Sequence, residues 1–150
     1  IQDIFKSGNY VDLHAITKGK GFQGPVKRFG ISIRQHKSEK AIRNPGSLGP
    51  WYGHAHFMWR VPHAGKMGYH QRTEYNKQIM MISDEIEKVS QEGGFLKYGK
   101  LKNPYIMIKG SVPGPKKRLV VFTAPMRLKK GSVKEAPVVK YISKKSKQGK

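Results

Sequence analysis

The sequence contains no cysteine, few acidic residues and no long apolar segment. Without thiols the chain has neither disulfide bonds nor thiolate metal ligands, which suits a reducing compartment. No apolar run approaches the roughly 20 residues that a membrane-spanning helix needs, so we do not expect an integral membrane protein. The first residues, Ile1-Gln2-Asp3, include neither an initiator methionine nor a secretory apolar stretch. We therefore expect the chain to begin inside a longer polypeptide.

What the chain does contain is positive charge, with 30 Lys and Arg against nine Asp and Glu and a formal net charge of +21. A compact body with this charge would repel itself, so the composition implies a polyanionic partner. Nucleic acid, an anionic membrane surface or an acidic protein would each serve. The charge is also uneven, because residues 84–92 hold four acids whereas residues 97–130 hold none.

Short β-rich runs predict a mainly β fold. Residues 10–17 alternate in polarity as a half-buried strand does, and residues 78–82 form a shorter apolar run that we also assign to a strand. Residues 104–109 and 119–123 are β-rich and are separated by Gly and Pro, which predicts a hairpin with a basic connection. Residues 84–90 predict a short polar helix.

Residues 18–77 follow a different pattern. They are rich in Gly, Pro, Arg, Lys and His, and their apolar residues are mostly isolated. Such a segment cannot bury enough apolar surface by itself to offset the entropy of ordering it. It nevertheless carries Trp, Tyr and Phe, which disordered linkers lack. Aromatic rings stack on unpaired bases, which folded RNA exposes, so the pattern favours a segment that becomes ordered against RNA.

Four motifs extend this argument: TKGKGFQGPVKRFG at residues 17–30, PGSLGPW at 45–51, AGKMGYHQRTEYNK at 64–77 and KGSVPGPKKR at 109–118. Together and in this order they closely resemble large-subunit ribosomal protein three, the universal L-three family, in its archaeal form. Members of that family are longer, so the resemblance makes this chain a later part of such a protein.

The resemblance implies a partial β-barrel of the translation-protein type with a long irregular basic extension. Residues 1–17 and 78–130 would form the barrel body, 18–77 the extension that penetrates ribosomal RNA, and 131–150 a Lys-rich tail. The protein would be a structural constituent of the large subunit that binds its 23S-type RNA and supports assembly. Its extension would approach the peptidyl-transferase centre, and its expected neighbours are ribosomal proteins fourteen and twenty-four-e. No cofactor, membrane or small-molecule substrate is expected.

The expected RNA contacts are basic, histidine and aromatic residues of the matched segments. Trp51, in a Gly-Pro turn without an obvious core, would lie at the inner tip of the extension and pack on RNA; its alternative role is a local hydrophobic anchor. For any one basic residue, a solvated basic face remains the alternative. The full set is Lys18, Lys20, Lys27, Arg28, Arg34, His36, Arg43, Trp51, Arg60, His63, Lys66, Tyr69, His70, Arg72, Lys77, Lys116, Lys117 and Arg118.

Other functions find less support in the sequence. His54, His56, His63 and His70 invite a metal site, but the ligand set is incomplete because Glu74 is the only nearby carboxylate. No nucleophile–base pair forms a recognisable motif, so we expect no catalytic residue. The main alternative is a non-ribosomal basic protein that compacts nucleic acid, and an RNA-processing enzyme is a weaker one.

Overall fold

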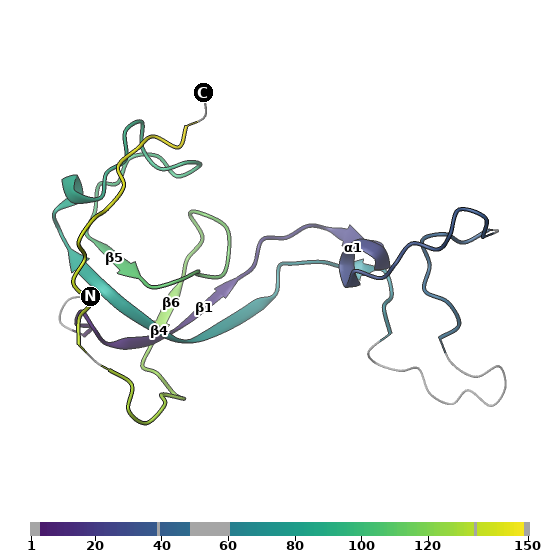
Figure 1. The fold of residues 1–150 in the computed structure, drawn as a ribbon, viewed down its shortest axis with the longest axis horizontal. Helices are drawn as coiled ribbons and strands as arrows, with labels where there is room; N and C mark the ends of the chain where they lie inside the picture. The colour runs from purple at the N-terminus through teal and green to yellow at the C-terminus, as the bar shows by residue number, and fades with distance from the viewer. Residues whose placement is uncertain (1–3, 39, 49–60, 134, 149–150) are drawn as a thin grey trace. The chain divides into compact units, whose positions relative to one another are not determined.

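The computed structural model describes residues 4–38, 40–48, 61–133 and 135–148 (Figure 1). The chain divides into two compact units, the first made of Ile1–Thr17 with Gln71–Lys150 and the second of Lys18–His70. Each unit is considered separately below. Within the described parts of the chain, no helix has the length and apolar character needed to cross a bilayer.

The first unit is built on a four-stranded sheet with the order β5-β4-β1-β6 (Figure 1). Its strands are β1 (Tyr10–Ile16), β4 (Gln71–Ser83), β5 (Tyr105–Ile108) and β6 (Val121–Thr123), and each neighbouring pair is antiparallel. Two further strands pair in the second unit, and the sheets are open. The prediction of a mainly β fold is therefore confirmed.

All four predicted strands form, but the predicted hairpin between the last two is wrong. β5 and β6 lie at opposite edges of the sheet, with β4 and β1 between them. The reason is the length of β4, which pairs with β1 through its first part and with β5 through Ile79–Ser83. Of the helix predicted at residues 84–90, only a single 3-10 turn forms, η1 (Ile86–Lys88).

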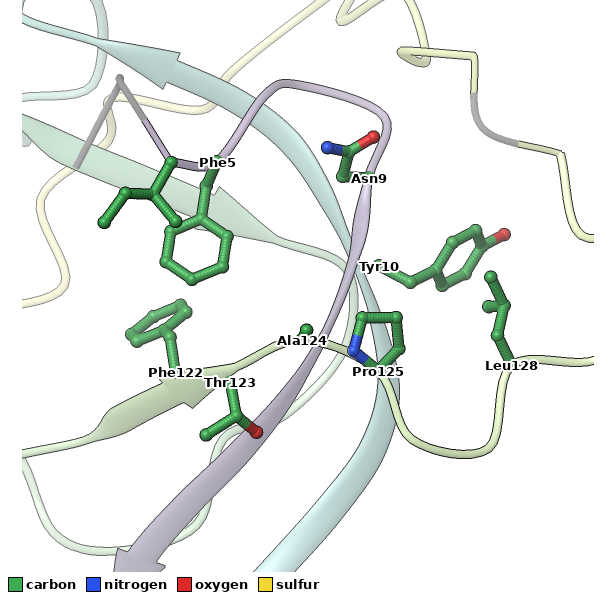
Figure 2. A pocket seen from close by; sticks show the side chains of 9 residues that line it. Phe5, Asn9, Tyr10, Phe122, Thr123, Ala124, Pro125 and Leu128 are labelled. Carbon is green, nitrogen blue, oxygen red and sulfur yellow. The ribbon is translucent and has the colours of Figure 1, made fainter.

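The core of the first unit lies where β1 meets β4. Val11, Leu13 and Ile79 are fully buried. Phe5 packs on this cluster and meets Phe122 of β6, with ring centroids 6.0 Å apart. Beside these two rings opens a pocket of about 460 Å³, and Figure 2 shows the side chains that line it. The core is thus small and remains open on this side.

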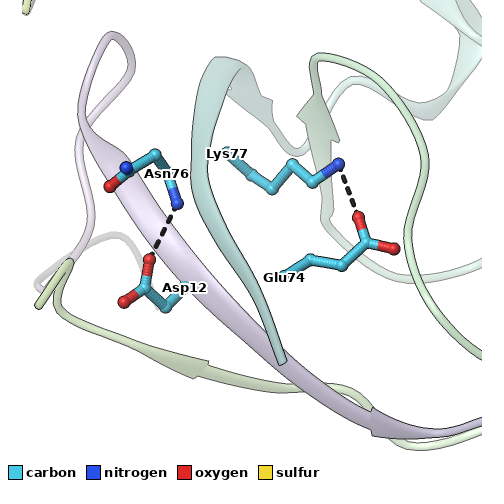
Figure 3. A network of polar contacts seen from close by, with 4 residues as sticks. All are labelled: Asp12, Glu74, Asn76 and Lys77. Atoms are coloured by element: carbon cyan, nitrogen blue, oxygen red, sulfur yellow. Dashed lines mark hydrogen bonds and ion pairs between the residues drawn. The ribbon is translucent and has the colours of Figure 1, made fainter. Parts of the chain in front are cut away.

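A β-bulge in β4 brings a charged residue into this core. Val11 pairs with Lys77 while Leu13 pairs with Glu74, so β4 has one residue more than β1 at this point. Asp12 is completely buried there, and its carboxylate accepts the backbone N–H of Asn76 at 2.8 Å, as Figure 3 shows. Its second oxygen accepts the N–H of Met126 at 2.9 Å. Asp12 therefore joins β1 to two distant segments.

A histidine also links three strands. The Nδ1 atom of His14 in β1 lies 2.8 Å from the hydroxyl of Thr73 in β4, and its Nε2 atom lies 3.0 Å from that of Thr123 in β6. Threonine hydroxyls can donate or accept, so both ring nitrogens are satisfied in either tautomer. His14 thus has a structural role in the sheet.

Candidate nucleic-acid interface

The second unit is held together by a short antiparallel ladder. β2 (Phe22–Gln23) pairs with β3 (Gly65–Lys66), so that Phe22 lies opposite Lys66. Two backbone hydrogen bonds extend the ladder: Lys20 N–H donates to Met67 at 2.9 Å, and Met67 N–H donates to Gly21 at 2.9 Å. The ladder thus brings together segments that lie far apart in the sequence.

At the end of this ladder the two backbones approach too closely for a side chain. Gly68 has φ +73°, and a Cβ atom there would lie 2.0 Å from the carbonyl oxygen of Lys18 and 3.2 Å from Cα of Gly19. Both the backbone conformation and the available space require glycine at this position.

The helix α1 (Pro25–Phe29) follows β2, and Arg28 fastens it to the opposite segment. Proline at the start of α1 and Gly30 in the left-handed conformation after its end are favourable helix boundaries. Nη1 of Arg28 donates to the carbonyl of His63 at 2.9 Å, and its Nε donates to that of Lys66 at 3.2 Å. Its guanidinium also lies 5.0 Å from the ring centroid of Phe29. Arg28 therefore positions the backbone of the second unit.

None of the described residues of the second unit is buried, so this part of the unit contains no hydrophobic core. Phe22 is 78% exposed, Tyr69 57% and Phe29 50%. The ammonium of Lys66 lies 5.9 Å from the ring centroid of Tyr69, so positive charge lies beside this exposed ring. Exposed aromatic rings of this kind are suited to stacking on bases.

The charge of this unit is almost entirely of one sign, since residues 18–70 contain ten Lys and Arg and a single acid, Glu39. In the described part, most of the predicted RNA contacts are solvent-exposed. These are Lys18, Lys20, Lys27, Arg34, His36, Arg43, His63, Lys66 and Tyr69, whereas Arg28 and His70 are half-buried. Trp51, Arg60, His54 and His56 lie outside the described residues.

The remaining predicted contacts belong to the first unit. Arg72 and Lys77 lie on β4, which begins at Gln71, and Lys116, Lys117 and Arg118 follow β5. Lys77 pairs with Glu74 (Figure 3), so part of its charge is already balanced. Lys116 and Lys117 are exposed, while Arg118 is half-buried. The predicted set is therefore divided between the two units.

The set of predicted contacts also omitted residues that the structure brings to the surface. Lys37 and Lys40 are exposed beside the predicted contacts Arg34 and His36, and their place in the basic run was the signal available in the sequence. Phe22 was omitted as well, although it is the most exposed aromatic residue in the described part of the second unit. An isolated Phe gives no indication of exposure until its strand partner is known.

From the sequence we expected neither a metal site nor a catalytic centre. Within residues 4–38, 40–48, 61–133 and 135–148, no three His, Cys, Asp or Glu side chains come together in a way that could hold a metal ion. A basic, aromatic-bearing segment whose described residues are all at least partly exposed, in the same chain as a small β-sheet, is typical of a ribonucleoprotein component.

Comparison with known proteins agrees with this class. The family model described as "Ribosomal protein L3" matches residues 1–149. The chain is similar to the large ribosomal subunit protein uL3 of Methanothermobacter thermautotrophicus, with 56% identity over 98% of this chain and 44% of that protein. It is similar to uL3 of Methanospirillum hungatei (50% identity, 99% of this chain, 44% of that protein) and of Methanococcoides burtonii (49%, 99% and 44%). The chain belongs to the ribosomal protein L3 family, and it spans less than half the length of these relatives.

Proposed function

We propose that the chain is part of a structural constituent of the large ribosomal subunit, in the cytoplasm, and that it binds large-subunit ribosomal RNA. The observation that carries the proposal is the second unit, which combines positive charge and exposed aromatic rings with the absence of buried residues in its described part. Such a unit gains its stability from a polyanion that neutralises the charge and covers the rings. The names of two archaeal relatives assign those proteins to the large ribosomal subunit, which supports large-subunit RNA as the polyanion.

The finer parts of the proposal rest on the family resemblance. Trp51 would lie at the tip of the extension near the peptidyl-transferase centre, and proteins fourteen and twenty-four-e would be neighbours. The 18 predicted contact residues, in both units, would meet phosphates or bases. The role of the protein in this proposal is architectural rather than catalytic, and it supports assembly by neutralising the phosphates of packed RNA segments.

Sedimentation tests the proposal directly. Tagged full-length protein in cell lysate should migrate with large subunits and ribosomes through a gradient at raised salt, because loose charge attraction is screened there. Release into the light fractions, with the subunits intact, would instead favour a protein that compacts nucleic acid without selectivity.

A single phosphate contact should be visible in the salt dependence of binding. Lys27 is exposed in α1, so Lys27→Ala should lower the affinity of full-length protein for large-subunit RNA. It should also flatten the slope of log K against log salt concentration by about one unit. Lys88→Ala is the matched control, because it removes the same charge from a residue that pairs with Glu85 in the acidic segment. Equal slopes for all three proteins would remove Lys27 from the contact surface.

A further inference from the structure

A pocket of about 360 Å³ lies in the second unit beside α1. Its volume is at the lower end of the range of about 300–1,000 Å³ that is typical of small-ligand sites. Three prolines from three separate segments line it, together with one leucine, one alanine and two polar residues. These residues are Pro25, Pro45, Pro62, Leu48, Ala64, Asn44 and His63.

The walls of this pocket are fixed by hydrogen bonds. The N–H of His63 donates to the carbonyl of Val61 at 2.8 Å, which closes a γ-turn around Pro62. The carbonyl of His63 in turn accepts Nη1 of Arg28 from α1, the helix that also carries Pro25. One guanidinium group therefore bridges these two walls, in addition to the ladder of β2 and β3.

Two glycines leave space for the arginine side chains beside this pocket. A Cβ atom at Gly65 would lie 2.8 Å from Nη1 of Arg28, so the guanidinium occupies space that only glycine leaves open. Arg34 lies against the segment that forms the third wall: its backbone N–H donates to the carbonyl of Ile42 at 3.1 Å, and a Cβ at Gly46 would lie 3.3 Å from its guanidinium. Arg28 thus joins two walls of the pocket, and Arg34 lies beside the segment of the third.

We propose that this pocket receives one unpaired nucleobase of the bound RNA, an inference that rests on the function proposed above. The proline rings offer rigid apolar surfaces, and their rigidity lowers the entropy lost on binding, while Leu48 adds further apolar surface. The side chains of Asn44 and His63 carry donors and acceptors that can meet the edge of a base. The surrounding positive charge suits the phosphates on either side of that nucleotide and disfavours a cationic ligand.

Base binding and phosphate binding respond differently to salt, which gives the test. Asn44 and Leu48 are exposed, so Asn44→Ala and Leu48→Ala remove no buried contact and should leave the fold intact. In the full-length protein the double variant should weaken binding to large-subunit RNA by roughly 5- to 150-fold. The salt slope should remain that of the wild-type protein, whereas Lys27→Ala should flatten it. Lys88→Ala again serves as the control without effect.

Ultraviolet crosslinking reports the contact itself, because irradiation joins an excited base to an adjacent side chain. The wild-type complex should yield nucleotide-bearing peptides that contain residues 44–48 or 62–64, and the double variant should lose them. Unchanged affinity of the double variant, or crosslinks only outside these peptides, would overturn the base pocket while the ribosomal proposal stands. Failure of the wild-type protein to prefer large-subunit RNA over unrelated duplex would instead overturn the proposed function.

Discussion

Replacing Gly68 with alanine should open the ladder of the second unit and lower the affinity for RNA at least tenfold. The added Cβ would lie 2.0 Å from the carbonyl oxygen of Lys18, a backbone atom that can move only if the ladder separates. The positive φ of this residue adds strain for any L side chain, of the order of 1–2 kcal/mol. Hydrogen exchange should show the change directly, with faster exchange at the amides of Lys20 and Met67, which donate across the ladder.

Gly21 provides a matched control for this variant. It has φ +70°, close to that of Gly68, but a Cβ there would meet nothing within 4 Å. Gly21→Ala should therefore introduce the same backbone strain without the steric clash, and it should leave both amides largely protected. If the two variants exchanged alike, backbone strain rather than the close approach to Lys18 would explain the requirement for glycine.

Removing the carboxylate of Asp12 should produce the largest loss of stability in the first unit. Asp12→Ala would leave the N–H groups of Asn76 and Met126 without the acceptor that each has now. Hydrogen bonds to a charged group contribute about 1.5–3 kcal/mol each, so the free energy of unfolding should fall by roughly 3 kcal/mol or more. Denaturant unfolding of the full-length protein, monitored by circular dichroism, measures this change.

Two further variants show whether the carboxylate itself is responsible. Asp12→Asn keeps the shape and one acceptor oxygen but turns an NH₂ group toward the second N–H, so its loss should be intermediate. Glu87→Ala removes an exposed acid in η1 and should change stability by less than about 0.5 kcal/mol. Similar losses for Asp12→Asn and Asp12→Ala would mean that one of the two hydrogen bonds contributes little.

The strands of the first unit could be predicted because their residues carry the necessary pattern. Tyr10–Ile16 alternates in polarity, and Tyr105–Ile108 and Val121–Thr123 are β-rich with turn residues around them. Their pairing could not be predicted in the same way. A turn between β5 and β6 suggests a hairpin. The 13 residues of β4, however, provide β5 with hydrogen-bonding partners along a greater length than the three residues of β6 could.

The second unit was harder to predict because few of its residues follow a periodic pattern. β2 and β3 are two residues each, and α1 is five residues long, so none of the three leaves a periodic signal. The concentration of charge and aromatic residues was visible in the sequence. The position of Arg28 against two carbonyl groups was not, because a basic residue in a basic segment indicates a phosphate contact equally well. Its part in RNA binding stays a prediction, and so do those of Trp51 and the other predicted contacts.

The pairing of β1 with β4 also has a consequence for folding. Within the described sheet, both partners of β1 follow it in the chain, and all of Lys18–His70 must be closed into a loop before β4 can pair. Compared with a connection of about five residues, closing a loop of this length costs only about 2 kcal/mol more, because the cost grows with the logarithm of length. A long insertion is therefore compatible with a stable sheet. Its main effect is on the rate of folding, because contacts between distant residues form slowly. During synthesis, β1 cannot pair until β4 and β6 have been made.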